Sequence, residues 1–330
     1  MCSTSNMARV EFNRQVFELA DGSNLLSALE QRGLNPRRGC GVGVCQGCLV
    51  QILEGIISPR AQEGLSPHQT AQGLAMACMC QVSGIFRAQT LSEPSTRFAS
   101  EVLRQRWLKG DILQLCVSKP FDYQPGQFVR IFATEGAVGE LNAVGRCYSL
   151  ASLPQEAHLE FHIRVLPDGQ MSQYLAHIPL GSPLYLQGPM GRCFYQATSL
   201  GQPLLLAAIG TGMAPILGVA RAALKAGHTG PIYCVMGAKE ESGLYPLPGL
   251  HQVAAAPNVK ISYIVQQAGL HSDTYEIGDI YRTIASLLPS MDGFQAYICG
   301  APSFVKKLKK QCFLAGANLN DIFADAFLPS

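Results

Sequence analysis

Residues 37–50 read RRGCGVGVCQGCLV, and this stretch decides the fold of the first part of the chain. Three cysteines, Cys40, Cys45 and Cys48, follow the spacing C-x4-C-x2-C, and Cys78 follows after a further 29 residues. This spacing is typical of four thiolates that hold a [2Fe–2S] cluster. The interleaved glycines permit a positive φ and a close wrap of the backbone around sulfide; they are Gly39, Gly41, Gly43 and Gly47.

The fourth ligand is open between two thiols. Residues 73–82, GLAMACMCQV, offer both Cys78 and Cys80. Cys78 gives the expected spacing and is favoured, although either thiol would also serve as a small buried hydrophobe. Zinc is the competing ion for the whole set. Its sites usually use C-x2-4-C pairs in two separated halves, which three cysteines in one glycine-rich loop match poorly.

The residues around the loop resemble the plant-type ferredoxin domain, a β-grasp fold, over about residues 7–90. Two runs, ARVEFN and QVFELA, alternate as the strands of a hairpin do, and SNLLSALEQRG predicts a short amphipathic helix with Ser23 as its N-cap. The polar stretch SEPSTR (92–97) is a plausible linker. We therefore place a ferredoxin domain at residues 1–92.

Composition narrows the class of protein. The chain has 330 residues, of which 48% are hydrophobic and 15% charged, with a net charge of +2 and twelve cysteines. The length suggests two or three domains, and the near-neutral balance gives no reason to expect nucleic acid as a partner. The N-terminus carries no secretory signal pattern. A cytoplasmic location is expected, where clustered cysteines indicate metal or catalysis.

One uncharged stretch, residues 193–220, is long enough to cross a bilayer. It contains several glycines and prolines, and its apolar residues form two blocks, LLLAAIG and APILGVARAAL. The first block predicts a short buried strand and the second a helix. We therefore expect a strand–glycine turn–helix here and no membrane insertion.

Short alternating runs dominate residues 98–194, separated by turn signals such as PGQ and PDG, and predict an antiparallel barrel. Arg146 and Tyr148, in the run RCYS, share one face of a strand, which offers a guanidinium for phosphate beside an aromatic ring. The run GQMS (169–172) begins a predicted helix, whose N-terminal amides suit a phosphate. Each motif alone is weak.

In this order, downstream of PGQ and upstream of GPMG (188–191), the motifs resemble the flavin-binding barrel of the ferredoxin–NADP reductase superfamily. We place this domain at residues 97–196, and the resemblance favours FAD. The resemblance implies that Arg146 binds the flavin phosphate, that Tyr148 packs against the ring system and that Ser149 lies near the reactive nitrogen. It also implies a flavin contact at Val165. The pyrophosphate would be bound by the backbone amides of Gly169, Gln170, Met171 and Ser172.

From Pro203 onward, apolar strands alternate with helices, which predicts a parallel sheet covered on both faces. We place this α/β domain at residues 197–330. The loop after its first strand is a G-x-G-x-x-P sequence that suits a dinucleotide pyrophosphate, and proline is tolerated in the first helical turn. The candidate residues in this loop are Gly210, Thr211, Gly212 and Pro215.

A second motif, Cys299-Gly300-Ala301-Pro302, ends the last core strand of this domain and begins another helix. Together the two motifs resemble the NAD(P) domain of the same superfamily. The resemblance implies that Cys299, Gly300 and Pro302 lie at the nicotinamide and that Phe327 shields the flavin, with Phe323 as its rival. Lys239 stands where the superfamily contacts the adenosine ribose, but it does not decide between NADH and NADPH as the electron donor. The resemblance in domain order favours NADH.

The whole chain is thus an α+β multidomain protein that resembles the reductase component of bacterial multicomponent oxygenases. NADH gives up two electrons as hydride and the cluster accepts one at a time, so a flavin belongs between them. The resemblance implies hydride transfer at Ser149 and Cys299, the catalytic residues, and then single electrons to an oxygenase or hydroxylase component or another acceptor protein. The alternatives are the same chain serving a deoxysugar-nucleotide dehydratase, and a non-catalytic zinc scaffold. A monomer is expected.

Overall fold

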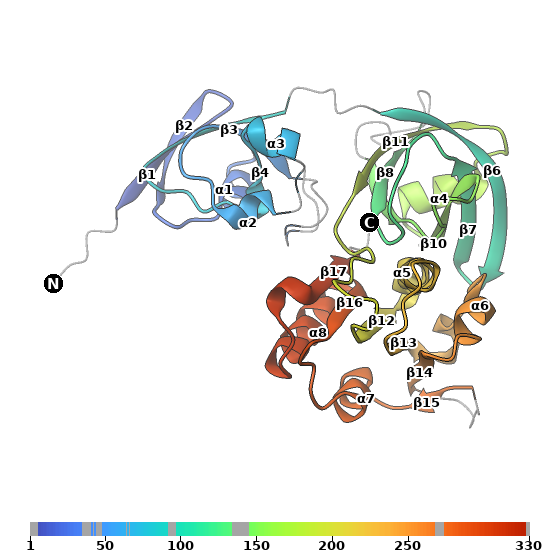
Figure 1. Ribbon diagram of the computed structural model, residues 1–330. Coiled ribbons are helices and arrows are strands. Elements are labelled where there is room, and N and C mark those ends of the chain that lie inside the picture. Colours follow the sequence, from blue (N-terminus) through green and yellow to red (C-terminus); the bar gives the residue numbers. More distant parts are fainter. Residues whose placement is uncertain are drawn as a thin grey trace. The chain divides into compact units, whose positions relative to one another are not determined.

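The computed structural model describes residues 6–34, 41, 43, 48–63, 65, 67–91, 97–133, 145–267 and 274–327 (Figure 1). The chain divides into two compact units, residues 1–95 and 96–330. The flavin-type barrel and the nucleotide-binding part therefore fall together in the second unit. Each unit is described below by itself.

The first unit is a five-stranded mixed sheet with the order β2-β1-β5-β3-β4. The predicted hairpin is confirmed, because β1 and β2 pair antiparallel, while β5 lies parallel to β1. Alternate residues of β1 point into a core shared with α1. This is the predicted β-grasp arrangement. Its elements are β1 (Met7–Phe12), β2 (Gln15–Ala20), α1 (Leu25–Gln31), β3 (Leu49–Glu54), α2 (Pro59–Gln62), α3 (Pro67–Ala71), β4 (Leu74–Met76), η1 (Ala77–Met79) and β5 (Ile85–Thr90).

The N-cap of α1 is Asn24, so the prediction of Ser23 is wrong by one residue. The Asn24 side chain accepts a hydrogen bond from the Ser27 amide at 3.1 Å, which satisfies one of the amides at the start of the helix. Its Nδ2 also donates to the Cys78 carbonyl at 2.8 Å. An asparagine has a donor as well as an acceptor, so this one side chain both caps α1 and fixes the segment that carries Cys78.

The second unit begins with a six-stranded antiparallel sheet in the order β10-β7-β6-β11-β8-β9. Its inward-facing residues form one apolar core, and α4 packs on that core through Met171 and Leu175. The predicted antiparallel barrel is confirmed (Figure 1). Its elements are β6 (Phe98–Lys109), β7 (Ile112–Ser118), β8 (Phe128–Phe132), β9 (Arg146–Ser149), β10 (His158–Arg164), α4 (Gln170–His177) and β11 (Pro183–Met190).

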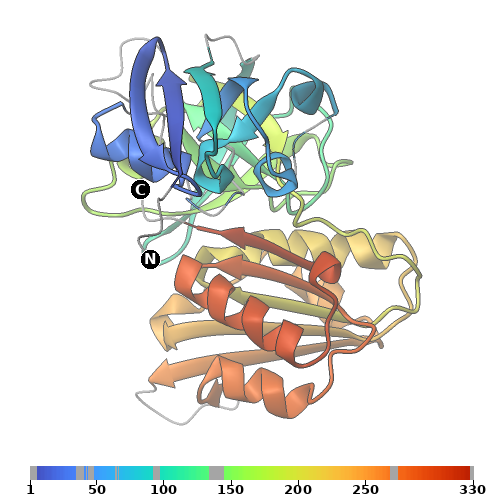
Figure 2. The ribbon, with the colours of Figure 1, turned by 90° about the vertical axis from the view of Figure 1, so that its left-hand side faces the viewer.

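The rest of this unit is a parallel sheet in the order β15-β14-β13-β12-β16-β17. Helices α5 and α6 pack on one face and α7 and α8 on the other, as Figure 2 shows for α5 and α8. The elements are β12 (Leu204–Ile209), η3 (Gly210–Gly212), α5 (Met213–Lys225), β13 (Ile232–Glu240), η4 (Glu241–Gly243), α6 (Leu250–Ala254), β14 (Val259–Gln267), β15 (Glu276–Ile277), α7 (Ile280–Leu287), β16 (Gln295–Gly300), α8 (Pro302–Leu314), η5 (Leu319–Asp321) and β17 (Ile322–Ala326).

The uncharged stretch 193–220 forms β12, a glycine turn and the first part of α5, as predicted. The five leucine and alanine residues of β12 are buried because helices cover both faces of the sheet. In the part of the chain that the structure describes, every helix is too short or too polar to cross a membrane.

Candidate functional site

The cluster loop is described at Gly41, Gly43 and Cys48, whereas Cys40 and Cys45 lie outside the described residues. Gly41 and Gly43 have φ values of 67° and 77°, a region that favours glycine. A Cβ added at Gly43 would stand 2.7 Å from Cγ of Met79, so only glycine lets the loop approach this side chain. Two glycines at positive φ, one of them close against Met79, fit a loop that wraps tightly around an inorganic cluster.

The two candidates for the fourth ligand differ in their surroundings. The Cys78 amide donates to Sγ of Cys48 at 3.5 Å, and Cys78 is only half-buried beside that thiol. Cys80 is buried in the core of the first unit. Burial, followed by the charge of Cys48, raises the pKa of the Cys80 thiol to about 12. A ligand must be a thiolate, so these surroundings favour Cys78.

In the barrel, β9 presents Arg146 and Tyr148 on the same face, in register with Ile131 and Val129 of β8. The Tyr148 hydroxyl is buried and has no hydrogen-bond partner within the described part of the chain. Burial raises the pKa of Tyr148, and the nearby charge of Arg146 partly opposes this rise. An unpaired buried hydroxyl is costly, so it fits a site completed by a ligand such as the flavin.

The segment 169–172 forms the start of α4, as predicted. The Ser172 hydroxyl donates to the Gly169 carbonyl at 3.0 Å and accepts from the Leu166 amide at 3.1 Å. A Cβ at Gly169 would stand 2.4 Å from this hydroxyl. The Ser172 side chain therefore braces the turn, which leaves the first-turn amides of Gln170, Met171 and Ser172 for a ligand. Val165 is half-buried, and its amide donates to the Asp111 backbone carbonyl at 2.8 Å.

The nucleotide loop and the second glycine motif lie against each other. A Cβ at Gly212 would stand 2.4 Å from the carbonyl oxygen of Cys299, and one at Gly300 would stand 2.5 Å from Cγ1 of Ile209. Gly210 has a φ of 57°, and Pro215 lies inside the first turns of α5, where its missing amide proton costs little. Pro302 begins α8 in the same way. The two motifs thus meet at the carboxyl ends of β12 and β16.

This close approach makes Gly212 sensitive to substitution. For Gly212→Ala we expect bound FAD to be kept and reduction of the flavin by NADH to slow more than tenfold, because the new methyl group displaces the loop. Gly201→Ala is the matched control, since a Cβ there meets nothing within 4 Å. Rapid-mixing spectroscopy measures both variants. A Gly212→Ala protein as fast as Gly201→Ala would show that the loop is not used for NADH.

Cys299 is fully buried at the end of β16. Its Sγ lies 3.6 Å from Sγ of Cys193, which follows β11 of the barrel. Burial raises the pKa of Cys299 well above its usual value, and the neighbouring Cys193 raises it further. Cys299 is therefore a neutral thiol, suited to packing rather than to nucleophilic attack.

Asp325 is a buried carboxylate that no sequence motif predicts. It lies on β17, in register with Cys299 of β16. The Ser149 hydroxyl on β9 of the barrel donates to its Oδ2 at 2.9 Å. This hydrogen bond joins the strand assigned to the flavin with the strand beside the nicotinamide motif. A signal for it was available in the sequence, because a lone aspartate in the apolar run IFADAF requires a partner.

The two aromatic candidates near the C-terminus occupy different environments. Phe323 is buried and stacks on Tyr297, with ring centroids 5.2 Å apart. Phe327 is half-buried just after β17, and its amide donates to the Gly300 carbonyl at 2.8 Å. Phe323 thus serves core packing, while Phe327 stands at the junction of β16 and β17. This placement favours Phe327 for the flavin-shielding role.

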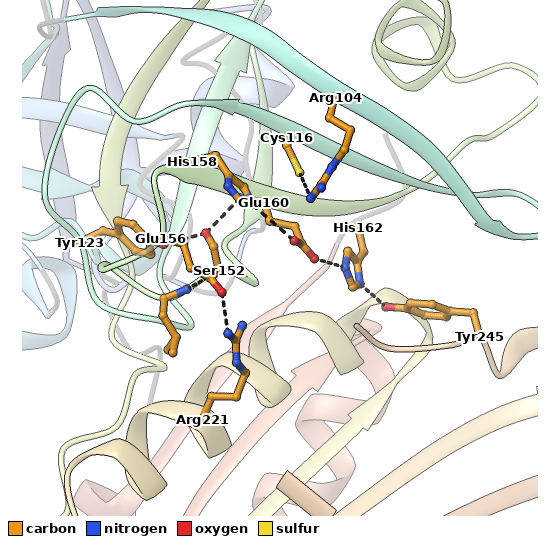
Figure 3. A network of polar contacts seen from close by, with 11 residues as sticks. Arg104, Cys116, Tyr123, Ser152, Glu156, His158, Glu160, His162, Arg221 and Tyr245 are labelled. Atoms are coloured by element: carbon orange, nitrogen blue, oxygen red, sulfur yellow. Dashed lines mark hydrogen bonds and ion pairs between the residues drawn. The ribbon is translucent and has the colours of Figure 1, made fainter. Parts of the chain in front are cut away.

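A polar network lies on the outer face of β10 (Figure 3). The Cys116 sulfur, a His158 ring nitrogen and a Glu160 carboxylate oxygen lie within 4.8 Å of one another. Atoms of these types can also bind a metal ion. The Arg104 guanidinium donates to the Cys116 thiol at 3.3 Å, so a cation already occupies this side of the set. Burial raises the pKa of Glu160, but hydrogen bonds from His162 and Gln114 and the nearby His162 and His158 together lower it to about 2. These residues are therefore engaged in polar contacts within the protein.

Comparisons with protein-family models agree with this geometry. A model described as "2Fe-2S iron-sulfur cluster binding domain" matches residues 9–83. A model described as "Oxidoreductase FAD-binding domain" matches residues 111–195, and one described as "Oxidoreductase NAD-binding domain" matches residues 206–310. The three matches follow the order expected from the sequence.

Among solved structures, an Amycolatopsis cytochrome P450 reductase, GcoB, has a TM-score of 0.67 at 22% identity and covers 98% of this chain and 99% of its own. The ferredoxin reductase in carbazole 1,9a-dioxygenase has a TM-score of 0.65 at 23% identity over 98% of this chain and 99% of its own. These likenesses support the fold.

Among curated proteins, the ferredoxin–NAD(P)+ reductase component of the naphthalene 1,2-dioxygenase system of Pseudomonas putida is 30% identical over 97% of this chain and 98% of its own length. Reductase component 1 of terephthalate 1,2-dioxygenase from Comamonas sp. is 24% identical over 95% of each chain. The predicted family is confirmed. The chain belongs to the ferredoxin–NAD(P)+ reductase components, oxidoreductases with 2Fe-2S, FAD-binding and NAD-binding domains.

Proposed function

We propose that this chain takes hydride from NADH onto FAD and passes single electrons through a [2Fe–2S] cluster to an oxygenase component. The observation that carries the proposal is the hydrogen bond from Ser149 to Asp325. It brings the end of the flavin strand β9 to the end of the nucleotide sheet, where Cys299 lies in register with Asp325. Ligands of parallel α/β sheets bind at this carboxyl edge.

Each part of the chain has a defined task in this proposal. Bound FAD accepts two electrons as hydride and releases them one at a time, which the cluster requires. Arg146 and the amides of residues 169–172 hold the flavin phosphates, and Tyr148 packs on its ring. Phe327, half-buried at the junction of β16 and β17, would shield the flavin ring. The amides of η3, Gly210–Gly212, at the start of α5 hold the NADH pyrophosphate, because a helix N-terminus favours negative charge.

The cluster has four proposed ligands, Cys40, Cys45, Cys48 and Cys78. The glycine cradle beside Met79 and the exposure of Cys78 relative to Cys80 support this set. A purified protein is expected to contain iron and acid-labile sulfide in equal amounts, together with FAD, and to reduce ferricyanide with NADH. Stoichiometric zinc without sulfide would overturn the proposal and favour the zinc scaffold.

NADH is the proposed donor. Lys239 is exposed near the end of β13, but Glu240 and Glu241 follow it directly and oppose a 2′-phosphate. We expect a kcat/KM for NADH at least tenfold above that for NADPH, and a smaller residual use of NADPH in Lys239→Ala. Steady-state ferricyanide assays with both nucleotides measure this ratio. A preference for NADPH that disappears in Lys239→Ala would reverse the assignment.

The proposed acceptor is an oxygenase in the cytoplasm, served by a monomer of this chain. Support comes from the relatives, which are components of dioxygenase systems. The rival acceptor is a deoxysugar-nucleotide dehydratase. Mixing the reductase and NADH with each type of acceptor distinguishes these two hypotheses. We expect product formation coupled to NADH oxidation with an oxygenase component, and none with the dehydratase. Coupling to the dehydratase alone would contradict the proposal.

A further inference from the structure

Helix α5 begins at the nucleotide loop and lies against the barrel. A Cβ at Gly218 of this helix would stand 3.4 Å from the Ala151 carbonyl oxygen, and Val219 lies close to Gly126 of the barrel. Further along the helix, the Arg221 guanidinium donates to Oε1 of Glu156 at 2.5 Å. The side chains of Arg221 and Glu156 are 17% and 31% exposed, so this ion pair is partly shielded from water. The helix that carries the nucleotide loop is thus tied to the segment between β9 and β10.

A second tie joins the loop after β13 to the barrel (Figure 3). Tyr245, which is 6% exposed, places its hydroxyl 3.1 Å from Nδ1 of His162 on β10. Nε2 of His162 lies 2.8 Å from Oε1 of Glu160, and the His162 side chain is fully buried. Every polar atom of this buried ring is therefore paired, which fixes its orientation. This contact connects a second loop, at the carboxyl edge of the nucleotide sheet, to the barrel.

The barrel side of both contacts lies within a short segment, which holds Glu156, Glu160 and His162. The nucleotide side comes from two separate elements: Arg221 lies on α5, and Tyr245 lies in the loop after β13. Two ties from neighbouring barrel positions to two nucleotide elements resist both sliding and rotation of one part on the other. Hydride transfer depends steeply on distance and alignment, and a displacement of about 1 Å costs roughly a hundredfold in rate.

We propose that Arg221–Glu156 and Tyr245–His162–Glu160 are positioning contacts that hold the nicotinamide against the flavin for hydride transfer. The inference rests on the proposed function, because it assigns these residues to the NADH-to-FAD step. None of them touches the reacting atoms. They act on the rate of the step through the orientation of α5 and the Tyr245 loop.

The test compares Tyr245→Phe, Arg221→Met and the double variant with wild-type holoenzyme in anaerobic rapid mixing with NADH. We expect flavin reduction at saturating NADH to slow about threefold in each single variant and at least tenfold in the double variant. The charge-transfer absorbance between NADH and flavin is expected to weaken in parallel. The apparent Kd for NADH should change less than threefold, and Arg221→Lys should recover most of the rate.

Tyr195→Phe is the matched control. The Tyr195 hydroxyl lies 3.0 Å from Nδ1 of His228 in a pair of the same T-shaped geometry, but this pair does not reach β10 of the barrel. Its flavin reduction should match the wild type. If Tyr245→Phe and Arg221→Met reduce the flavin at the wild-type rate and keep the wild-type charge-transfer absorbance, the inference is overturned. If the double variant loses FAD, the two single variants decide the question. A wild-type enzyme that fails to oxidise NADH would instead overturn the proposed function.

Discussion

Cys78→Ser is expected to abolish electron delivery to a protein acceptor while leaving reduction of ferricyanide by NADH in place. The cluster loses a thiolate ligand, whereas ferricyanide takes electrons from the flavin in the second unit. Iron and acid-labile sulfide should fall to near zero, with the FAD content unchanged. Metal analysis, the visible spectrum and the two acceptor assays measure these effects.

Cys80→Ser is the matched control because it changes a thiol two residues away. Cys80 is buried in the core, and burial raises its pKa to about 12, so it is expected to stay a neutral packing residue. The variant should keep the cluster and the delivery of electrons. Loss of the cluster in Cys80→Ser with retention in Cys78→Ser would transfer the fourth ligand to Cys80.

The second large effect is expected at the hydrogen bond between Ser149 and Asp325. Ser149→Ala leaves a buried carboxylate without this donor, at a cost of about 1–3 kcal/mol. If the cost falls on the hydride step, the rate drops roughly 5- to 150-fold, since about 1.4 kcal/mol is tenfold. Asp325→Asn should lower the rate similarly, and the double variant should be little slower than either single one. Anaerobic flavin reduction measures all three.

Ser100→Ala serves as the control for this pair. Ser100 is also buried in the barrel, and its hydroxyl donates to the Ser118 carbonyl at 2.7 Å, but both residues belong to the barrel alone. We expect Ser100→Ala to lose about as much stability as Ser149→Ala without a change in the rate of hydride transfer. Rates in Ser149→Ala and Asp325→Asn equal to that of Ser100→Ala would exclude the pair from the hydride site.

Local patterns predicted much of the fold because each reports a local constraint. The alternation in β1 and β2 and the apolar run of β12 follow directly from burial on one face or on both. The N-cap of α1 was placed one residue early because Ser23 and Asn24 are both good caps. Only the structure shows that Asn24 also bonds to the Cys78 segment, 54 positions away in the chain.

The contacts that join distant segments could not be predicted from one sequence. The strand β17 was not anticipated, so Asp325 was missed, although it pairs with the last core strand at Cys299. The contacts of Arg221 with Glu156, just before β10, and of Tyr245 with His162 on β10 depend on how the barrel meets the parallel sheet, which no spacing pattern encodes. Motif glycines such as Gly212 were found because close backbone approach excludes every side chain.

Rapid mixing of the oxidised holoenzyme with one equivalent of NADH under anaerobic conditions tests the central claim most directly. Spectra followed over time separate the absorbance of the flavin from that of the iron–sulfur cluster. The proposed electron path predicts that the flavin absorbance bleaches first and that the cluster absorbance falls afterwards, as the flavin partly recovers. A flavin that is reduced while the cluster stays oxidised, or a cluster reduced before the flavin, would contradict it.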